Sequence, residues 1–387
     1  MQQQMMVKEI RGIDWDFKGY KRGGIHNIHW VQATYIPQIP SILISILGNN
    51  AKLIFDGYCA SGTTLIESIR LGKPCIGVDI NPLFCEISRS KITYYDLKKL
   101  NNFCEDIKIK IKKNKESLIP DFPNRENWYE KNTLKELGEI FYIVENEKNQ
   151  KYQRLLRVLF SSILKRCCSQ TEHYTYVADN MFISDPKKLK YVDAKKEFEI
   201  KINKFFNSMH DFYQELKHNK INIKKILSEC SVYQKDSRHL DFIESGSIDF
   251  IVTSPPYVNV TDYATGHRLS FYWMKYLGDM KEIKDLEIGA RWKRSRKNAV
   301  NEYLSDMTLS FNEMFRILRN NSYLCCVLSE TSSENKKGNI IDELKKIFVE
   351  KVGFELVDGN ISRNIHGKRI RTKCGVKKEE ILILRKK

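Results

Sequence analysis

Long apolar runs are missing from this chain of 387 residues. The longest extends only from Ile39 to Leu47, far short of the roughly 20 apolar residues that a membrane-spanning helix needs. The first residues, MQQQMMVKEIRGIDW, contain no apolar core of the kind that secretory signals carry. We therefore expect neither a membrane protein nor a secreted one, and we predict a cytoplasmic protein.

Paired cysteines are also lacking. The chain has 10 cysteines, but none of them form a Cys-x-x-Cys pair, and no group of cysteine and histidine has the spacing of a zinc site. Several cysteines lie inside apolar segments such as SYLCCVLS, which indicates buried, reduced thiols. We therefore expect no metal site in this protein.

Acidic residues are too few to balance the basic ones. The chain has 65 Lys and Arg against 48 Asp and Glu, which gives a formal net charge of +17. Such a balance favours a polyanionic partner such as nucleic acid. The hydrophobic content of 42% excludes wholesale disorder, and a chain of this length is expected to form about two domains.

Short apolar segments that resemble buried strands alternate with helical segments in two parts of the chain. The predicted strands are Lys52–Phe55, Cys75–Val78, Ile248–Val252, Tyr323–Leu328, Phe354–Val357 and Ile381–Leu384. This alternation predicts an α/β fold with a doubly wound, Rossmann-like sheet. A Lys-rich region of helical spacing separates the two parts. We therefore divide the chain into 1–95, a mostly helical insertion at 96–230, and 231–387, and we expect 1–25 to be irregular.

A turn of small residues, DGYCASGTT, follows the first predicted strand and opens a helix. Gly57 and Gly62 permit a close approach of the backbone to a ligand, and Asp56 ends the strand. Asp79 ends the next predicted strand, where a carboxylate can accept hydrogen bonds from both hydroxyls of a ribose. The pattern predicts a nucleoside cofactor, either NAD or S-adenosylmethionine, with an ordinary strand–helix turn as the alternative. No G-K-[ST] follows, which excludes a Walker-type phosphate loop.

The tetrapeptide Ser254-Pro255-Pro256-Tyr257 directly follows the predicted strand IDFIV. Two consecutive prolines cannot continue a strand ladder, because they have no N–H donors. They stiffen the backbone and leave carbonyl groups facing the crevice above the strand ends. A tyrosine beside them can present a flat face to a planar ligand. A packed Pro-Pro turn without a ligand is the alternative.

Three motifs in this order, FDGYCASGTT, GVDINP and TSPPY, resemble those of the DNA amino-methyltransferases of restriction–modification type. The resemblance covers roughly 26–95 and 231–385 and is weak in the insertion. It implies a methyltransferase sheet, S-adenosyl-L-methionine as cofactor, double-stranded DNA as substrate and a possible cognate restriction endonuclease. Ser-Pro-Pro-Tyr is typical of enzymes that act on cytosine N4, whereas Asp-Pro-Pro-Tyr and Asn-Pro-Pro-Tyr are typical of adenine N6.

The resemblance also implies roles for individual residues. The Ser254 hydroxyl and the Pro255 carbonyl would accept hydrogen bonds from the target amine, and Tyr257 would stack on a base rotated out of the duplex. The implied cofactor contacts are Asp56, Gly57, Cys59, Ser61, Gly62, Thr63, Asp79, Ile80, Asp236 and Ser237, with Tyr35 and Pro37 in a segment that closes over the methionine end. The family usually has Gly where this chain has Ala60, which is tolerable only if the backbone φ there is negative.

Basic loops and the insertion are the predicted DNA contacts. Residues that could contact phosphates or bases are Arg291, Lys293, Arg294 and Arg296 in one loop, Arg363, His366, Lys368, Arg369 and Arg371 in the closing hairpin, and His173 and Asn180 in the insertion. Charged surface loops are the alternative. Asp262, Tyr263, His267 and Arg268 could line the pocket. Phe271, Trp273 and Tyr276 are expected on the core face of a helix instead.

Several other functions compete with a cytosine-N4 methylase. A cytosine-C5 enzyme needs a Pro-Cys nucleophile after the catalytic strand, but Pro74-Cys75 enters the second strand, which suits a buried thiol. Adenine-N6 methylation is the main alternative, and a base methylase acting on RNA is a third, because one sheet serves many substrates. A DNA-binding module with a degenerate site is the non-enzymatic alternative.

Overall fold

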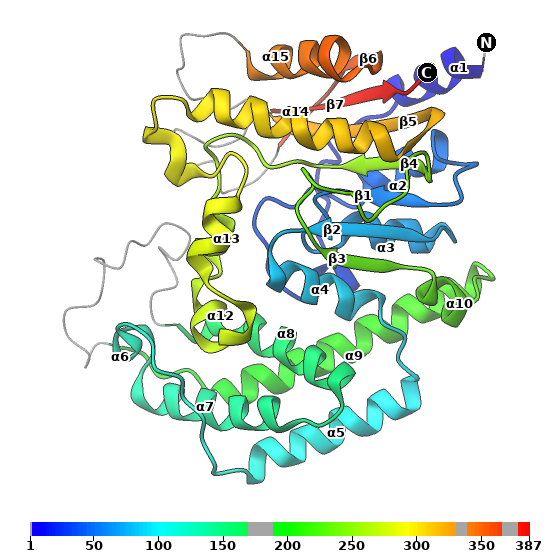
Figure 1. Ribbon diagram of the computed structural model, residues 1–387. Helices are drawn as coiled ribbons and strands as arrows, with labels where there is room; N and C mark the ends of the chain where they lie inside the picture. Colours follow the sequence, from blue (N-terminus) through cyan, green and yellow to red (C-terminus); the bar gives the residue numbers. More distant parts are fainter. Residues whose placement is uncertain (1, 169–188, 330–338, 366–377) are drawn as a thin grey trace.

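A single seven-stranded sheet forms the centre of the protein (Figure 1). The computed structural model describes residues 2–168, 189–329, 339–365 and 378–387. The strand order is β3-β2-β1-β4-β5-β7-β6. The strands are β1 (Ile54–Asp56), β2 (Cys75–Asp79), β3 (Ser231–Gln234), β4 (Ile248–Thr253), β5 (Leu318–Ser329), β6 (Glu355–Asn364) and β7 (Lys378–Arg385).

Strands β1 to β5 are parallel, and the closing hairpin of β6 and β7 is antiparallel. β1 lies between β2 and β4: Ile54 pairs with Cys75 on one side and with Phe250 on the other. From β1 the sheet is built outward in two directions, through β2 and β3 on one side and through β4 and β5 on the other. The loops after β1 and β4 therefore separate and leave a crevice at the carboxyl ends of these strands.

Alternating side chains of the strands feed two hydrophobic cores, one on each face of the sheet. In β1, Ile54 points to one core and Phe55 to the other; in β4, Val252 and Ile251 divide in the same way. Helices α2 (Gln38–Ile46), α3 (Thr63–Arg70) and α4 (Pro82–Ile92) cover the first face. Helices α14 (Ala299–Ile317) and α15 (Ile340–Lys346) cover the second. The predicted doubly wound α/β fold is confirmed.

Four long helices extend the molecule beyond the β3 edge of the sheet (Figure 1). They are α5 (Leu97–Lys113), α7 (Lys131–Asn146), α8 (Gln150–Cys167) and α9 (Ala194–His218). Their buried residues, such as Leu159 and Phe205, belong to the same hydrophobic core as Ile54 of the sheet. The helical part is therefore packed onto the sheet rather than built around a separate core.

The remaining elements are short. They are α1 (Gln2–Arg11), α6 (Arg125–Trp128), α10 (Ile223–Ser228), α11 (Tyr263–Gly266), α12 (Arg268–Trp273), α13 (Met280–Leu286), η1 (Gly24–Asn27), η3 (Lys275–Leu277), η4 (Arg291–Ser295) and the π-helix η5 (Ile347–Val352). The expectation of an irregular start is wrong, because α1 forms there and Ile10 is fully buried against the core. No helix among the described residues is long and apolar enough to cross a bilayer.

Candidate active site

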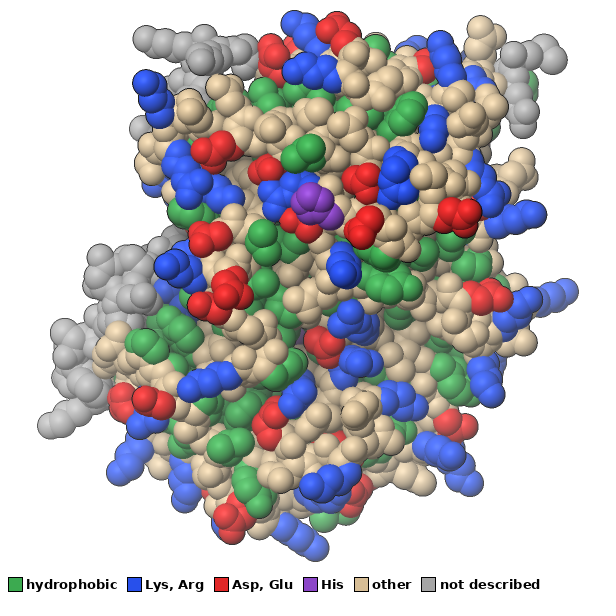
Figure 2. Space-filling model, viewed as in Figure 1, with side chains coloured by type: hydrophobic (Ala, Val, Ile, Leu, Met, Phe, Trp, Pro, Cys, Tyr) green, Lys and Arg blue, Asp and Glu red, His purple; other side chains and the backbone are tan. Residues whose placement is uncertain are grey.

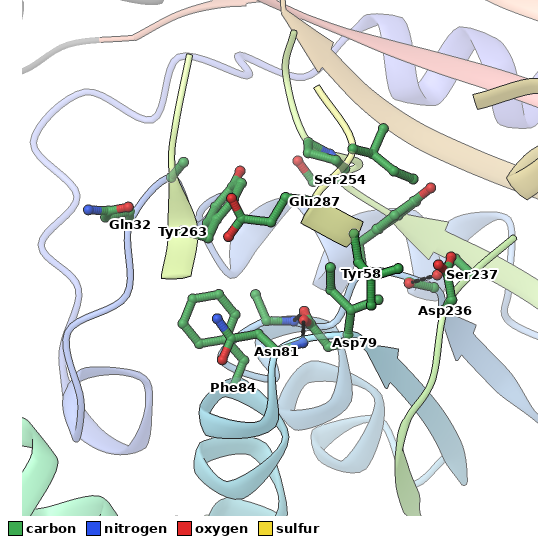
Figure 3. Close-up of a pocket in the computed structure, with 17 residues that line it drawn as sticks. Gln32, Tyr58, Asp79, Asn81, Phe84, Asp236, Ser237, Ser254, Tyr263 and Glu287 are labelled. Carbon is green, nitrogen blue, oxygen red and sulfur yellow. Dashed lines mark hydrogen bonds between the residues drawn. The ribbon is translucent and has the colours of Figure 1, made fainter. Parts of the chain in front are cut away.

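A pocket with an empty volume of about 660 Å³ opens at the carboxyl ends of β1, β2 and β4. Its lining combines residues from several segments of the chain: Gln32, Ala33, Gly57, Tyr58, Ala60, Asp79, Ile80, Asn81, Phe84, Asp236, Ser237, Ser254, Pro256, Tyr263, Leu286, Glu287 and Ile288. Figure 3 shows Ser254 and Glu287 on one side of this space and Asp79 and Asn81 on the other. The two predicted motifs therefore meet in one pocket.

Asp79 presents its carboxylate to the pocket from the end of β2. One oxygen accepts a hydrogen bond from the backbone N–H of Ala60 at 2.9 Å, and the other accepts one from the N–H of Asn81 at 2.8 Å. Burial nevertheless raises the pKa of Asp79 to about 7. The remaining lone pairs of the carboxylate are available for the hydroxyls of a ribose. Ile80, also predicted as a cofactor contact, lines the pocket beside it.

The glycine turn after β1 is tightly packed. A Cβ atom at Gly57 would collide with Cε of Met314, and one at Gly62 would lie 2.9 Å from Oγ of Ser88. Gly62 also has a φ of +76°, in the left-handed region that favours glycine. Of the two, only Gly57 lines the pocket formed by the described residues. The backbone conformation therefore requires glycine at 62, whereas at 57 a side chain would have to displace the end of the Met314 side chain.

Asp56 lies beneath the pocket rather than on its wall. Its side chain is buried and accepts hydrogen bonds from the Thr253 hydroxyl at 2.6 Å, from the Tyr58 N–H at 3.0 Å and from the Thr64 hydroxyl. Burial raises its pKa. Because Thr253 immediately precedes Ser254, Asp56 joins the cofactor turn to the catalytic tetrapeptide.

Ala60 has a φ of +42°, so the condition set by the sequence, a negative φ, is not met. The Ala60 carbonyl accepts a hydrogen bond from Oγ of Ser88 at 2.7 Å, and its N–H donates to Asp79. These two bonds hold the residue in a conformation that costs a side-chain-bearing residue roughly 1–2 kcal/mol. The methyl group therefore adds strain to this turn.

The other predicted cofactor residues of the glycine turn lie behind the wall that the described residues form. Cys59 is buried, and burial raises the pKa of its thiol well above the usual value. The Ser61 carbonyl accepts a hydrogen bond from the buried Nζ of Lys91 at 2.6 Å. Thr63 Oγ1 accepts one from Arg22 at 2.7 Å. These residues shape the turn from behind.

The N-terminal segment contributes different residues from those predicted. The Tyr35 hydroxyl bonds the Thr64 hydroxyl inside the core, and Pro37 precedes helix α2 as its N-cap. Gln32 and Ala33, earlier in the same segment, line the pocket instead. The N-terminal segment therefore reaches the pocket, but through Gln32 and Ala33 and not through Tyr35 and Pro37.

Asp236 and Ser237 lie where β3 delivers them, at the end of the pocket beyond Asp79 (Figure 3). Asp236 forms an ion pair with Arg238 at 2.6 Å, and Arg238 forms a second with Asp306 at 2.6 Å. The Ser237 hydroxyl donates to the Gly57 carbonyl. These contacts fix both residues against the glycine turn, in a position that can face an adenine ring.

The predicted catalytic tetrapeptide divides between the pocket and the core. Ser254 and Pro256 line the pocket, whereas Pro255 and Tyr257 are not part of the wall that the described residues form. The Ser254 hydroxyl lies 3.4 Å from the Tyr257 hydroxyl, which is a long distance for a hydrogen bond between hydroxyls. It therefore remains available to a ligand. Tyr303 donates to the Pro256 carbonyl at 3.2 Å and supports the diproline corner from helix α14.

The Tyr257 hydroxyl is anchored by the closing hairpin. It donates to Glu379 on β7 at 2.8 Å, and Glu379 pairs with Arg363 on β6 at 3.0 Å. All three side chains are buried, and burial raises the pKa of Tyr257 well above its usual value. A buried carboxylate, itself paired with an arginine, thus fixes the aromatic ring next to the diproline corner.

Two of the residues predicted to contact DNA are buried, so these two predictions are wrong. Arg363 is 7% exposed and committed to the Glu379 pair just described. Lys293 is 9% exposed, and its Nζ donates to the carbonyl oxygens of Asp285 and Glu287. The expected place of these two cations on an open surface is wrong, because each satisfies buried acceptors of the protein itself.

The other basic residues of the loop around η4 face solvent to different degrees. Arg294 and Arg296 are exposed, and Arg291 is half-buried. The Arg296 guanidinium lies 4.6 Å from the centroid of the Trp292 ring and 3.2 Å from Glu302. His366, Lys368, Arg369, Arg371, His173 and Asn180 lie outside the described residues. On the face seen in Figure 2, Lys and Arg are interspersed with Asp and Glu, so the positive charge forms no continuous patch there.

The segment after the tetrapeptide contributes one pocket residue among those named from the sequence, Tyr263. Asp262 instead accepts a hydrogen bond from the Trp292 N–H at 2.9 Å, and the buried His267 packs 4.8 Å from the Trp30 ring. Arg268 donates to the Thr265 carbonyl.

Helix α12 and the turn after it carry the aromatic residues expected in the core. Phe271 and Trp273 are buried as expected, but Tyr276 is 45% exposed and lies under the Arg157 guanidinium. The predicted core position is therefore confirmed for Phe271 and Trp273, whereas Tyr276 lies at the surface.

Glu287 was missed by the sequence analysis. It is 3% exposed, lines the pocket and accepts a hydrogen bond from the Ala264 N–H at 2.6 Å. Burial raises its pKa to about 8. It lies far along the chain from the tetrapeptide, in a segment without a recognisable motif, so no local pattern could have indicated it. No group of three or more acidic, histidine or cysteine side chains that could hold a metal occurs in the described part of the chain.

Comparisons with known proteins give three relatives. The chain is 23% identical to the type II methyltransferase M.MjaII of Methanocaldococcus jannaschii, over 89% of this chain and 78% of the relative. It is 24% identical to the type II methyltransferase M.MvaI of Kocuria varians, over 73% of this chain and 66% of the relative. It is 26% identical to the type II methyltransferase M.BsoBI of Geobacillus stearothermophilus, over 70% and 56%. No family model matches the chain.

Proposed function

We propose that the chain is a DNA methyltransferase of restriction–modification type, like the relatives that it resembles, and that it transfers a methyl group from S-adenosyl-L-methionine to the exocyclic N4 of cytosine in a short double-stranded DNA sequence. One observation carries this proposal. Ser254 of the Ser-Pro-Pro-Tyr motif and Asp79 at the end of β2 line the same pocket. The acid proposed to bind the ribose and the hydroxyl proposed to bind the amine thus line one pocket.

The residues present fit S-adenosyl-L-methionine. Asp79 would offer lone pairs to the ribose hydroxyls, Asp236 and Ser237 at the far end of the pocket would face the adenine, and the methionine part would lie along Gly57 and Ala60 of the glycine turn. When bound, the cofactor supplies an electrophilic methyl carbon. The protein's contribution would be largely positioning, which can supply several kcal/mol of the barrier reduction.

The target amine needs help because its lone pair is delocalised into the base. The Ser254 hydroxyl and the Pro255 carbonyl would accept hydrogen bonds from the two amine hydrogens and favour the pyramidal form that attacks. Pro255 and Tyr257 are not part of the pocket wall formed by the described residues, so their contacts with the base are proposed from the resemblance alone. Tyr257, whose ring Glu379 fixes through its hydroxyl, would stack on the flipped base beside the pocket. A serine rather than an aspartate at 254 leaves this acceptor neutral, which supports cytosine over adenine.

The remaining parts of the protein would bind the duplex. The exposed Arg294 and Arg296 beside the pocket are suited to phosphate contacts, and the helical region at 96–230 would carry target recognition, with 1–95 and 231–387 forming the catalytic unit. We also propose that the modified site is the one cut by a cognate restriction endonuclease, so that methylation protects the host DNA.

Modification-sensitive sequencing of DNA from cells that express the protein would test the proposal. We expect N4-methylcytosine in one short sequence, and none with Ser254→Ala. N6-methyladenine at a defined sequence would overturn the choice of base but not of reaction. Methylation of RNA in a competition between duplex DNA and tRNA would overturn the choice of substrate. An undiminished rate in Ser254→Ala would overturn the assignment of the site.

A further inference from the structure

A buried acid faces the pocket, and the proposed reaction has not yet given it a role. Glu287 follows helix α13 and is 3% exposed, and its carboxyl group lines the same pocket as Ser254 and Asp79. Figure 3 shows it on the Ser254 side, next to the Tyr263 ring. The side of the pocket that would receive the amine therefore contains a carboxyl group as well as the serine hydroxyl.

Only half of this carboxyl group is satisfied. Oε1 accepts the hydrogen bond from the Ala264 N–H, whereas Oε2 is enclosed and has no partner among the described residues. The nearby Lys293 donates to the backbone carbonyl of Glu287. An enclosed, unpaired acceptor costs about 1–3 kcal/mol. Unpaired buried acceptors of this kind are typical of functional sites, where a bound ligand supplies the missing hydrogen-bond donor.

The groups around Glu287 influence whether its carboxyl group is protonated or ionised. The groups that face it are Asp262, Tyr263, Lys284, Lys293 and, across the pocket, Asp79. Burial is the main cause that raises its pKa to about 8; Asp262 adds to the rise, and the backbone N–H groups of Ala264 and Tyr263, with Lys284, oppose it. A positive charge placed in the pocket would favour the ionised form.

We propose that Glu287 accepts the proton that the exocyclic amine loses when it is methylated. This inference rests on the proposed function. The amine nitrogen forms a bond to the methyl carbon, and the sulfur keeps the electron pair of the broken sulfur–carbon bond and becomes a neutral thioether. The nitrogen is then cationic, and its N–H proton passes to Oε2 of the ionised Glu287. The positive charge of the sulfonium group is thus cancelled within the pocket.

Glu287→Gln tests this role, because the amide oxygen can still accept the Ala264 hydrogen bond but the side chain cannot take a proton. In single-turnover methyl transfer we expect a loss of about 100-fold or more, the range typical of a lost general base. The wild-type rate should rise with pH as Glu287 ionises, and this rise should be absent in Glu287→Gln. Glu287→Asp should recover part of the rate and the pH dependence.

Binding of S-adenosylhomocysteine, the uncharged product, reports whether the pocket remains intact. We expect Glu287→Gln to bind it as the wild type does, within about threefold. Asp358→Asn, at a buried acid of strand β6 that pairs with Arg11 and lies outside the pocket lining, is the matched control and should change neither rate nor pH profile.

Three results would separate the possible failures. A near-wild-type rate in Glu287→Gln, or an unchanged pH profile, would overturn the inference. Loss of product binding together with the rate would also overturn it, because Glu287 would then be structural. If the wild type binds S-adenosylhomocysteine but transfers no methyl group to DNA, the proposed function fails instead.

Discussion

The turn after β1 and the turn after β4 meet at the same edge of the sheet, but they are held in different ways. In the first, the supporting bonds to backbone N–H groups come from nearby carboxylates: Tyr58 N–H donates to Asp56, and Ala60 N–H donates to Asp79, 19 residues away. The Ser237 hydroxyl adds one bond from a distant segment, to the Gly57 carbonyl. In the second, they come from distant segments: Tyr303, 47 residues on from Pro256, and Glu379, 122 residues on from Tyr257.

This difference separates what a motif can specify from what only the fold can supply. The cofactor turn contains its own glycines, and its N–H groups bond the nearby Asp56 and Asp79, so much of its shape is specified by neighbouring sequence. The catalytic tetrapeptide is rigid, but its support is provided by helix α14 and the closing hairpin. Helix α14 also contacts the first turn, through Ser310 and Met314, whereas the closing hairpin supports Tyr257. Changes in the closing hairpin should therefore disturb the second turn more than the first.

Removing the carboxylate that supports Tyr257 should have the largest effect. Glu379→Leu leaves the Arg363 guanidinium buried and unpaired, which should lower the free energy of unfolding by about 3–5 kcal/mol in urea titrations. The double variant Glu379→Leu with Arg363→Leu removes both charges and should recover most of this loss. Equal destabilisation in the single and double variants would show that the ion pair is not the cause.

Asp79→Ala should break the first turn's function and spare the second. The loss of hydrogen bonds to a charged acceptor should weaken binding of S-adenosylhomocysteine about 10- to 100-fold in calorimetry, at roughly 1.5–3 kcal/mol for each such bond. Asp358→Asn, which removes a buried charge on β6 outside the pocket lining, is the control. Unchanged affinity in Asp79→Ala would exclude the ribose contact.

The raised pKa of Asp79 predicts a smaller, pH-dependent effect. Its pKa is about 7 in the folded protein, above its ordinary value of 3.8. The folded state therefore binds more protons than the unfolded state between these values, and this group's contribution to stability falls as pH rises through that window. Cofactor binding should have the opposite trend, because the ionised form accepts the ribose hydroxyls. Affinity should rise several-fold between pH 6 and pH 8, and Asp79→Asn should flatten the profile.

Ala60→Gly should have the smallest effect. Glycine relieves the positive φ at this position, and we expect a gain of up to about 1 kcal/mol in unfolding free energy or a few-fold tighter cofactor binding. Ala51→Gly, at a residue without a positive φ, should instead be neutral or destabilising. A loss of stability in Ala60→Gly would show that the turn is not strained.

Local sequence was sufficient where a feature is built from neighbouring residues. The apolar segments before Asp56, Asp79 and Ser254 predicted β1, β2 and β4, because buried parallel strands are continuous apolar runs. The residues at their carboxyl ends then fall in one crevice by the geometry of the sheet. Gly57 and Asp79 could be named as pocket residues for this reason.

The sequence could not indicate features that depend on tertiary packing. Glu287 and Glu379 are acids in segments without a motif, and their importance comes only from where α13 and β7 place them. Arg363 and Lys293 were expected to bind DNA because basic loops usually face solvent. Composition gives no sign that each would find buried acceptors of its own.

The bond between Asp56 and Thr253 has a consequence for how such an enzyme can diversify. It connects the two halves of the transfer site directly, through residues of the sheet rather than of the surrounding helices. Donor and acceptor would therefore keep their alignment when outlying regions are exchanged. New target sequences could then evolve by replacement of peripheral segments, while the chemistry at the centre is inherited unchanged.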